Sequence, residues 1–159
     1  MLSATTDFEL SSLLPANGGD GSTGFVVSGI PGQSVSSPGS SQSLGDVNQD
    51  GTDDFFVASS AGAGEGYLVF GRAGGFPAEL DLQTLNGTDG YVIDGTQIGA
   101  AFGGSGGGAG DVNHDGVPDL AISASGADPS PDRVDAGQAF VVFGGPDHLA
   151  QFDLADGFQ

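Results

Sequence analysis

The chain has 159 residues, of which 31 are Gly and 8 are Pro, and this composition argues against a helical bundle because Gly costs about 1 kcal/mol per helix position. The formal net charge is −19, with 21 acidic residues against two arginines and no lysine, which excludes binding to nucleic acid or to an anionic membrane. The absence of Cys excludes disulfides and Cys-ligated zinc. Hydrophobic residues make up 37% of the chain and fall in short blocks, which favours an all-β fold over disorder.

Residues 1–15 contain no basic region and no apolar stretch of signal length, and 18 consecutive apolar residues occur nowhere in the sequence. We therefore expect neither a cleavable secretory signal in these residues nor a membrane-spanning helix.

Short runs rich in Val, Ile, Phe and Tyr, bounded by Gly, Pro, Asn and Asp, predict strands along the whole chain. In chain order they are Gly24–Gly29, Ser34–Leu44, Asp54–Ser59, Tyr67–Phe70, Tyr91–Asp94, Gly99–Ala109, Asp119–Ala124 and Ala139–Phe143. Ser34–Leu44 and Gly99–Ala109 are rich in small residues, so we expect them to be inner strands crowded around an axis.

The second half of the chain repeats the first. Gly45–Asp54 returns as Gly110–Asp119, 65 residues later, and an apolar block follows each copy. A shorter segment occurs three times, as Phe8–Leu10, Glu79–Leu82 and Phe152–Leu154. Units of about four short strands are typical of β-propeller blades. We predict two four-stranded antiparallel blades: blade 1 over residues 34–97, blade 2 over 98–159 without its outermost strand, and an N-terminal segment over 1–33.

Each repeat places oxygen-bearing side chains on alternate residues before a Gly. The side-chain ligands expected from this spacing are Asp46, Asn48, Asp50 and Asp54 in the first copy and Asp111, Asn113, Asp115 and Asp119 in the second. The seventh loop residue, Thr52 or Val117, would supply a backbone carbonyl. Six or more oxygens in a flexible loop suit Ca²⁺ better than Mg²⁺, and no His or Cys cluster suits zinc. An ordinary Asp/Asn/Gly turn is the alternative for a single copy.

The EF-hand version of this motif is excluded by the sequence. It requires a bidentate Glu at the twelfth loop position and flanking helices, but that position holds Val57 in one copy and Ile122 in the other. Both lie inside predicted strands, so each loop joins two strands.

Ala101-Phe102-Gly103-Gly104-Ser105, followed by the loop 111–119 and Leu120–Ser125, resembles the FG-GAP repeat of integrin α-subunit β-propellers and their bacterial relatives. The resemblance extends over about residues 24–144. It implies that the Phe-Gly pair opens an inner strand, that Ca²⁺ binds the eight side chains named above, and that the chain serves in adhesion at a cell surface or outside the cell. Ser37-Pro38 stands where the first copy would carry Phe-Gly.

Two blades cannot close a ring, because propellers have about four to eight. Gly24–Gly29 is an outermost strand without a blade of its own, and we expect it to complete blade 2 of another copy by strand addition. A closing rotation between copies would give a ring, and a non-closing one a filament. The alternative is that the chain is a fragment of a larger propeller adhesin.

Catalytic constellations are not evident. His114 and His148 have no Gly-x-Ser-x-Gly nucleophile nearby, and the Gly run 103–108 is followed by no Lys, so we expect a protein that is not an enzyme. A second hypothesis is a carbohydrate-binding module that uses loop aromatics such as Phe76 and Phe158.

Overall fold

The computed structural model describes residues 9–32, 34–35, 42–59, 62–95 and 97–145. The described chain is all-β, with three short 3-10 helices and, within these ranges, no α-helix. No helix in the described ranges is long and apolar enough to cross a membrane. The strands are β1 (Val26–Ser28), β2 (Gln42–Gly45), β3 (Asp54–Ser59), β4 (Glu65–Val69), β5 (Glu79–Asp81), β6 (Gly90–Asp94), β7 (Phe102–Gly110), β8 (Asp119–Ala124) and β9 (Gln138–Val142). The 3-10 helices are η1 (Leu10–Leu13), η2 (Pro15–Asn17) and η3 (Leu82–Thr84).

The first repeat forms a four-stranded antiparallel sheet in the order β2-β3-β4-β6, as predicted for a blade. Its strands lie at the predicted places, with β3 matching the expected bounds. The predicted inner strand Ser34–Leu44 is seen as β2, which begins at Gln42, and residues 36–41 of that prediction lie outside the described ranges. Val35 makes an isolated bridge to Ser59.

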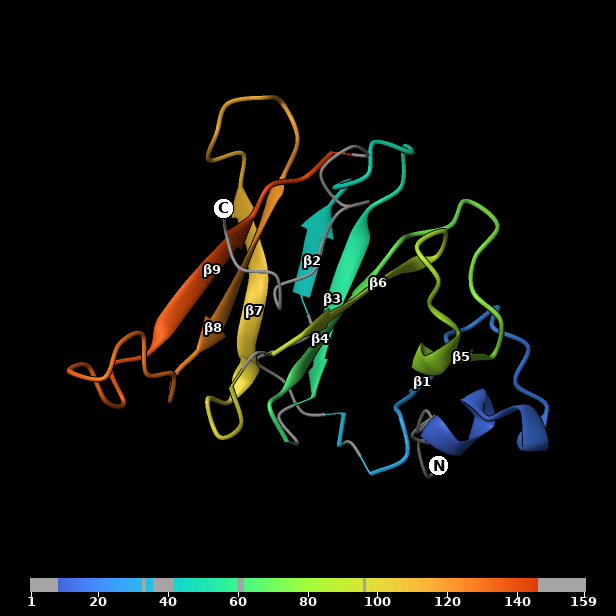
Figure 1. Cartoon of the computed structure of the whole chain (residues 1–159). Coiled ribbons are helices and arrows are strands. Elements are labelled where there is room, and N and C mark those ends of the chain that lie inside the picture. Colours follow the sequence, from blue (N-terminus) through green and yellow to red (C-terminus); the bar gives the residue numbers. More distant parts are fainter. Residues whose placement is uncertain (1–8, 33, 36–41, 60–61, 96, 146–159) are drawn as a thin grey trace, which may run out of the picture.

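The second repeat forms a three-stranded antiparallel sheet in the order β7-β8-β9. We predicted two four-stranded blades. Within the described chain, only the first repeat forms a sheet of four strands. The second sheet has the inner three strands that the sequence placed there. Figure 1 shows the two sheets side by side, with β7 facing the first sheet.

A third, two-stranded sheet was not predicted. β1 pairs in parallel with β5, with Val27 opposite Leu80. The segment expected to add to another copy therefore already pairs with its own chain, through one of its edges. Sequence reasoning found both segments but not their pairing, because parallel partners far apart in the chain leave no local pattern.

Two apolar cores separate these layers. One lies between the first and second sheets and includes Phe56, Leu68, Phe102, Leu120 and Ile122, all at most 2% exposed. The other lies between the first sheet and the β1–β5 layer. Since both faces of the first sheet are covered, nearly every residue of β3 and β4 is buried.

The ring of Phe56 explains why two positions that face it, Gly66 and Gly106, are glycine. A Cβ at Gly66, on the neighbouring strand β4, would lie 2.7 Å from its ring, and a Cβ at Gly106, on β7 of the second sheet, would lie 2.4 Å from it. The ring thus fills a gap that only glycine leaves open, and this contact sets how closely the two sheets approach.

Candidate metal loops

The two predicted metal loops lie at the same end of the molecule, at the top of Figure 1. One joins β2 to β3 and the other joins β7 to β8. The Gly145 N–H donates to the Val47 carbonyl at 2.7 Å, and a Cβ at Gly45 would lie 3.0 Å from the Pro118 side chain. The first loop is therefore hydrogen-bonded to the chain that follows β9, and its Gly45 lies close to Pro118 of the second loop.

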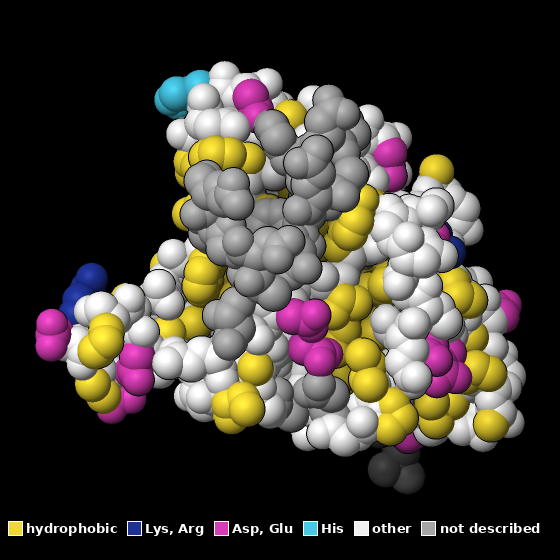
Figure 2. All heavy atoms as spheres, viewed as in Figure 1, with side chains coloured by type: hydrophobic (Ala, Val, Ile, Leu, Met, Phe, Trp, Pro, Cys, Tyr) yellow, Lys and Arg dark blue, Asp and Glu magenta, His cyan; other side chains and the backbone are white. Residues whose placement is uncertain are grey.

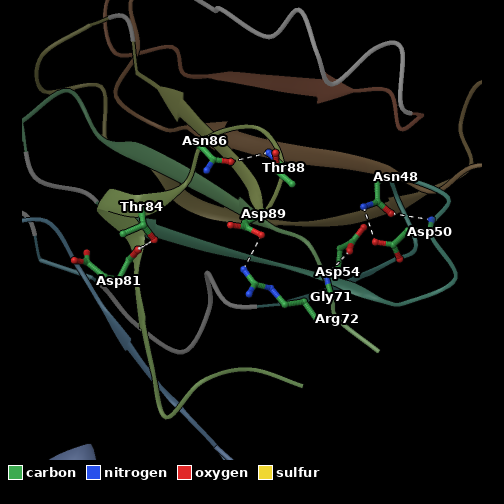
Figure 3. Close-up of polar contacts among 10 residues, drawn as sticks. All are labelled: Asn48, Asp50, Asp54, Gly71, Arg72, Asp81, Thr84, Asn86, Thr88 and Asp89. Carbon is green, nitrogen blue, oxygen red and sulfur yellow. Dashed lines mark hydrogen bonds and ion pairs between the residues drawn. The ribbon is translucent and has the colours of Figure 1, made fainter. Parts of the chain in front are cut away.

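The ninth loop residue is a buried carboxylate that ties three segments together. Asp54 is 1% exposed, and its two oxygens accept the N–H groups of Val47 at 2.9 Å and Gly71 at 2.7 Å. Figure 3 shows the second of these bonds. Because Val47 lies in the loop and Gly71 follows β4, Asp54 fastens the loop to the end of a neighbouring strand.

The second repeat has the same arrangement. Asp119 is 0% exposed and accepts the N–H groups of Val112 at 2.7 Å and Gly144 at 3.0 Å. Both bonds recur in the second copy of the repeated loop sequence, which indicates that they are a property of the motif. The sequence predicted these two residues only as metal ligands and missed this structural role.

The first ligand position organises the turn. The Asp46 carboxylate accepts the N–H groups of Asp50 at 2.9 Å and Gly51 at 2.8 Å. Asp111 does the same for Asp115 and Gly116, at 3.0 Å each. These bonds keep the side chain at the first position directed into its own loop.

The third and fifth positions also face one another. The Asn48 side-chain amide donates to Asp50 at 2.9 Å, and that of Asn113 donates to Asp115 at 2.7 Å. Figure 3 shows the first of these pairs. This hydrogen bond from Asn48 lowers the pKa of Asp50, so that carboxylate is ionised at neutral pH.

Backbone conformation follows the motif closely. Gly51 and Gly116, after the fifth position, have φ of 91° and 89°, which favours glycine as the sequence predicted. The fourth loop residues, Gln49 and His114, also have positive φ, at 62° and 63°. Sequence reasoning missed these two, because a left-handed conformation is uncommon for residues other than Gly.

Charge accumulates around Asp54. Burial, with the nearby charges of Asp50 and Asp46 adding to it, raises the pKa of Asp54 to about 6 even though two N–H groups stabilise its ionised form. Three carboxylates of one loop therefore interact electrostatically, which is the condition that a bound cation would relieve.

The donor set fits a hard cation, since every predicted ligand offers oxygen. Among the described residues, no three Asp, Glu or His side chains gather into a group that could hold a metal ion in this conformation. The carboxylates of Asp46, Asp50 and Asp54 instead accept backbone N–H groups. Calcium ligation by these side chains, and by the carbonyls of Thr52 and Val117, stays a prediction.

The other features singled out in the sequence lie elsewhere. Phe76 is half-buried and stacks on Phe25 with ring centroids 4.3 Å apart, so it packs a core instead of standing free at a loop tip. Phe158 and His148 lie outside the described ranges. The Gly run of β7 lines a shallow groove with Ala121, Ser123 and Ala139.

Most of the visible surface carries no concentration of charge. Figure 2 shows acidic side chains spread over the molecule, with basic ones at its margins. One of the two arginines, Arg72, pairs with Asp89 at 2.8 Å and lies 5.5 Å from the Phe76 ring centroid. Figure 3 shows this ion pair, which joins the chain after β4 to the loop before β6.

Comparison with known proteins agrees with the resemblance. Residues 102–142 match the family model of the FG-GAP repeat. This range begins at the Phe-Gly pair of β7 and includes the second loop, β8 and β9. A search of curated proteins found no match.

Proposed function

We propose, from the FG-GAP repeat at residues 102–142, that this chain is a calcium-binding structural and adhesive β-propeller module that associates with other copies of itself, outside the cell or at its surface. No catalytic role is included in this proposal. The FG-GAP match supports the propeller module.

The observation that carries the calcium proposal is the repetition of one loop geometry. Both loops bring acidic and amide side chains of the first, third and fifth positions inward by the same hydrogen bonds. A single turn of Asp, Asn and Gly forms bonds of this kind by itself. Here the whole pattern of oxygen-bearing side chains recurs at the same loop positions 65 residues later, inside a longer repeat. A shared ligand-binding role accounts for the repetition.

Bound calcium would supply positive charge to each loop and so offset repulsion among its carboxylates. In the first loop Asp46, Asn48, Asp50 and Asp54 would hold it, and in the second loop Asp111, Asn113, Asp115 and Asp119. Because the cation binds the folded loop and not the unfolded chain, it would raise the free energy of unfolding by about 2.7 kcal/mol per site at 100 times its dissociation constant.

The test is a calcium titration followed by calorimetry, with thermal unfolding measured in calcium and in chelator. The variants Asp50→Asn and Asp115→Asn should each remove one site. Asp53→Asn is the matched control, because Asp53 is an exposed neighbour outside the ligand set and the charge change is identical. An unchanged unfolding temperature in chelator, or equal loss of binding in the control, would refute calcium binding at these loops.

Self-association is proposed because the second sheet has three described strands where the first has four. The second sheet ends at β9, which pairs only with β8 among the described strands, and an open sheet edge is a ready template for another strand. Sedimentation or light scattering in calcium tests this, with a mass above 15.6 kDa expected. A stable monomer would refute it.

A carbohydrate-binding module remains the second candidate. Phe76 cannot serve it as a free platform, because its ring is stacked on Phe25. Binding to a glycan array that persists in chelator would favour this candidate over the calcium-dependent adhesive module. A fragment of a larger adhesin would instead give a calcium-binding monomer.

A further inference from the structure

The outward face of the second sheet is less covered than the same face of the first. Leu68 and Phe70 are 1% and 7% exposed, because the second sheet covers them. Their repeat equivalents, Val141 and Phe143, are 42% and 45% exposed. The face with Leu68 and Phe70 in the first sheet is therefore buried, whereas the equivalent face of the second sheet, with Val141 and Phe143, is exposed.

The first sheet shows what a complete blade looks like. Its third strand, β4, pairs in antiparallel fashion with β6, so that Tyr67 lies opposite Val92 and Glu65 opposite Asp94. β9 is the repeat equivalent of β4, but its only partner among the described strands is β8. One edge of β9 thus corresponds to an edge that β6 covers in the first repeat.

β1 is the repeat equivalent of β6, since Gly24–Gly29 matches Gly90–Gly95 in the sequence. It lies against the first sheet on the side away from β7. Phe25 stands 6.0 Å from Phe55 and 4.3 Å from Phe76 between ring centroids, and Val27 packs in the same core. In the described chain β1 pairs only with β5, which occupies one of its two edges.

We infer that β1 of a second copy adds to β9 in antiparallel fashion and in the register of β4 and β6. This inference rests on the proposed self-association and specifies its geometry. Transfer of the β4–β6 pairing through the repeat places Ser28 of one copy opposite Gln138 of the other, and Val26 opposite Phe140. β1 then uses one edge for its own β5 and the other for the second copy.

The strand that adds to β9 comes from a second copy of this chain, because the chain carries both surfaces of the contact: β1 at one end and the edge of β9 at the other. β1 is seated on the face of the first sheet that carries Phe55. A β9 strand added beside it would bring Val141 and Phe143 toward that same face, as Leu68 and Phe70 of the first sheet meet the second. The intermolecular contact would continue the packing seen between the two sheets within one chain.

Such a contact is heterologous, because it joins the N-terminal strand of one copy to the C-terminal sheet of the next. Its repetition gives a ring if the rotation between copies closes and a filament if it does not. Each copy inside a ring or filament uses β1 for one contact and β9 for the other. In neither product does such a copy leave the edges of these two strands unpaired.

Cross-linking tests the register directly, since the chain has no native Cys. The variants Ser28→Cys and Gln138→Cys, mixed and oxidised in calcium, should form a disulfide between copies because directly opposed residues lie within disulfide range. Val26→Cys mixed with Gln138→Cys is the control, offset by two residues or about 7 Å along the strand. We expect at least about tenfold less product from the offset pair, a difference of about 1.4 kcal/mol.

A second variant tests the exposed face of the second sheet, which the next copy would cover, and leaves the core of the monomer unchanged. Val141→Asp should lower the mass of the assembly in calcium, because it would place a charge in the contact with the next copy. Val134→Asp is the matched control, since Val134 is 66% exposed and lies outside the strands. Circular dichroism should show both variants folded, because neither side chain is buried in one chain.

The outcomes separate the inference from the proposal on which it rests. A monomer in calcium refutes self-association and this geometry together. An oligomer that cross-links equally in both pairs, or that survives Val141→Asp unchanged, refutes the geometry and leaves self-association standing. Preferential cross-linking of Ser28 to Gln138, with dissociation of the Val141 variant alone, supports both.

Discussion

Asp54 offers the sharpest test of how these loops work, because it is expected to stabilise the fold even without calcium. Replacing it by Asn keeps the shape and leaves one oxygen to accept an N–H. The second N–H, from Val47 or Gly71, would then face the amide NH₂ of the new side chain. An unsatisfied buried donor costs about 1–3 kcal/mol.

Removing the negative charge offsets part of this cost, since burial raises the pKa of Asp54 to about 6 and its ionised form is disfavoured. We therefore expect Asp54→Asn to lower the free energy of unfolding in chelator by about 1–2 kcal/mol, within the range for a buried hydrogen bond. Asp50→Asn, at an exposed loop position, should change it by less than about 0.5 kcal/mol. Urea denaturation in chelator measures both values.

Calcium should change this order. If both residues are ligands, the stability gained on adding calcium falls in both variants, whereas only Asp54→Asn is destabilised without the metal. Equal stability of Asp54→Asn and the unsubstituted protein in chelator would refute the assignment of a structural role to this carboxylate.

Three further predictions follow from the packing and charges. In calcium-free protein the pKa of Asp54, measured by ¹³C NMR, should lie near 6. This pKa exceeds the value of 3.8 in the unfolded chain, so the folded state binds the proton more tightly. The contribution of Asp54 to the free energy of unfolding should therefore increase as pH falls from about 7 toward 4. Gly106→Ala should destabilise by about 1–3 kcal/mol in urea, because the new methyl would lie 2.4 Å from Phe56. Arg72→Ala should cost about 0.5–1.5 kcal/mol in the same assay, because it removes an ion pair with Asp89 and a cation–π contact.

Each has its own control. An Asp54 resonance that titrates near pH 4 in chelator would contradict the first. Gly108→Ala should be tolerated, since its Cβ would find nothing closer than 3.5 Å, and equal destabilisation by the two alanines would contradict the second. Arg133→Ala removes the other arginine, which lies in an exposed turn, and should leave stability within about 0.5 kcal/mol.

The amino-acid sequence alone was enough to locate most strands and both loops. Short apolar blocks bounded by turn residues placed β3 and β8 at the bounds observed, because these signals act over a few residues. The repeat also predicted a second sheet without its outermost strand, and this stays a prediction because residues 146–159 lie outside the described ranges. Ligand identity followed from spacing and stays a prediction.

Tertiary structure decided the features that join distant residues. The parallel pairing of β1 with β5, the bonds of Asp54 to Val47 and Gly71, and the entry of Phe56 between two glycines each connect separate parts of the chain. Periodicity reports which face of a strand is apolar, but not which element covers that face. A buried carboxylate likewise looks the same in sequence whether it holds a metal, a backbone N–H or both, because only packing determines what lies within hydrogen-bond distance.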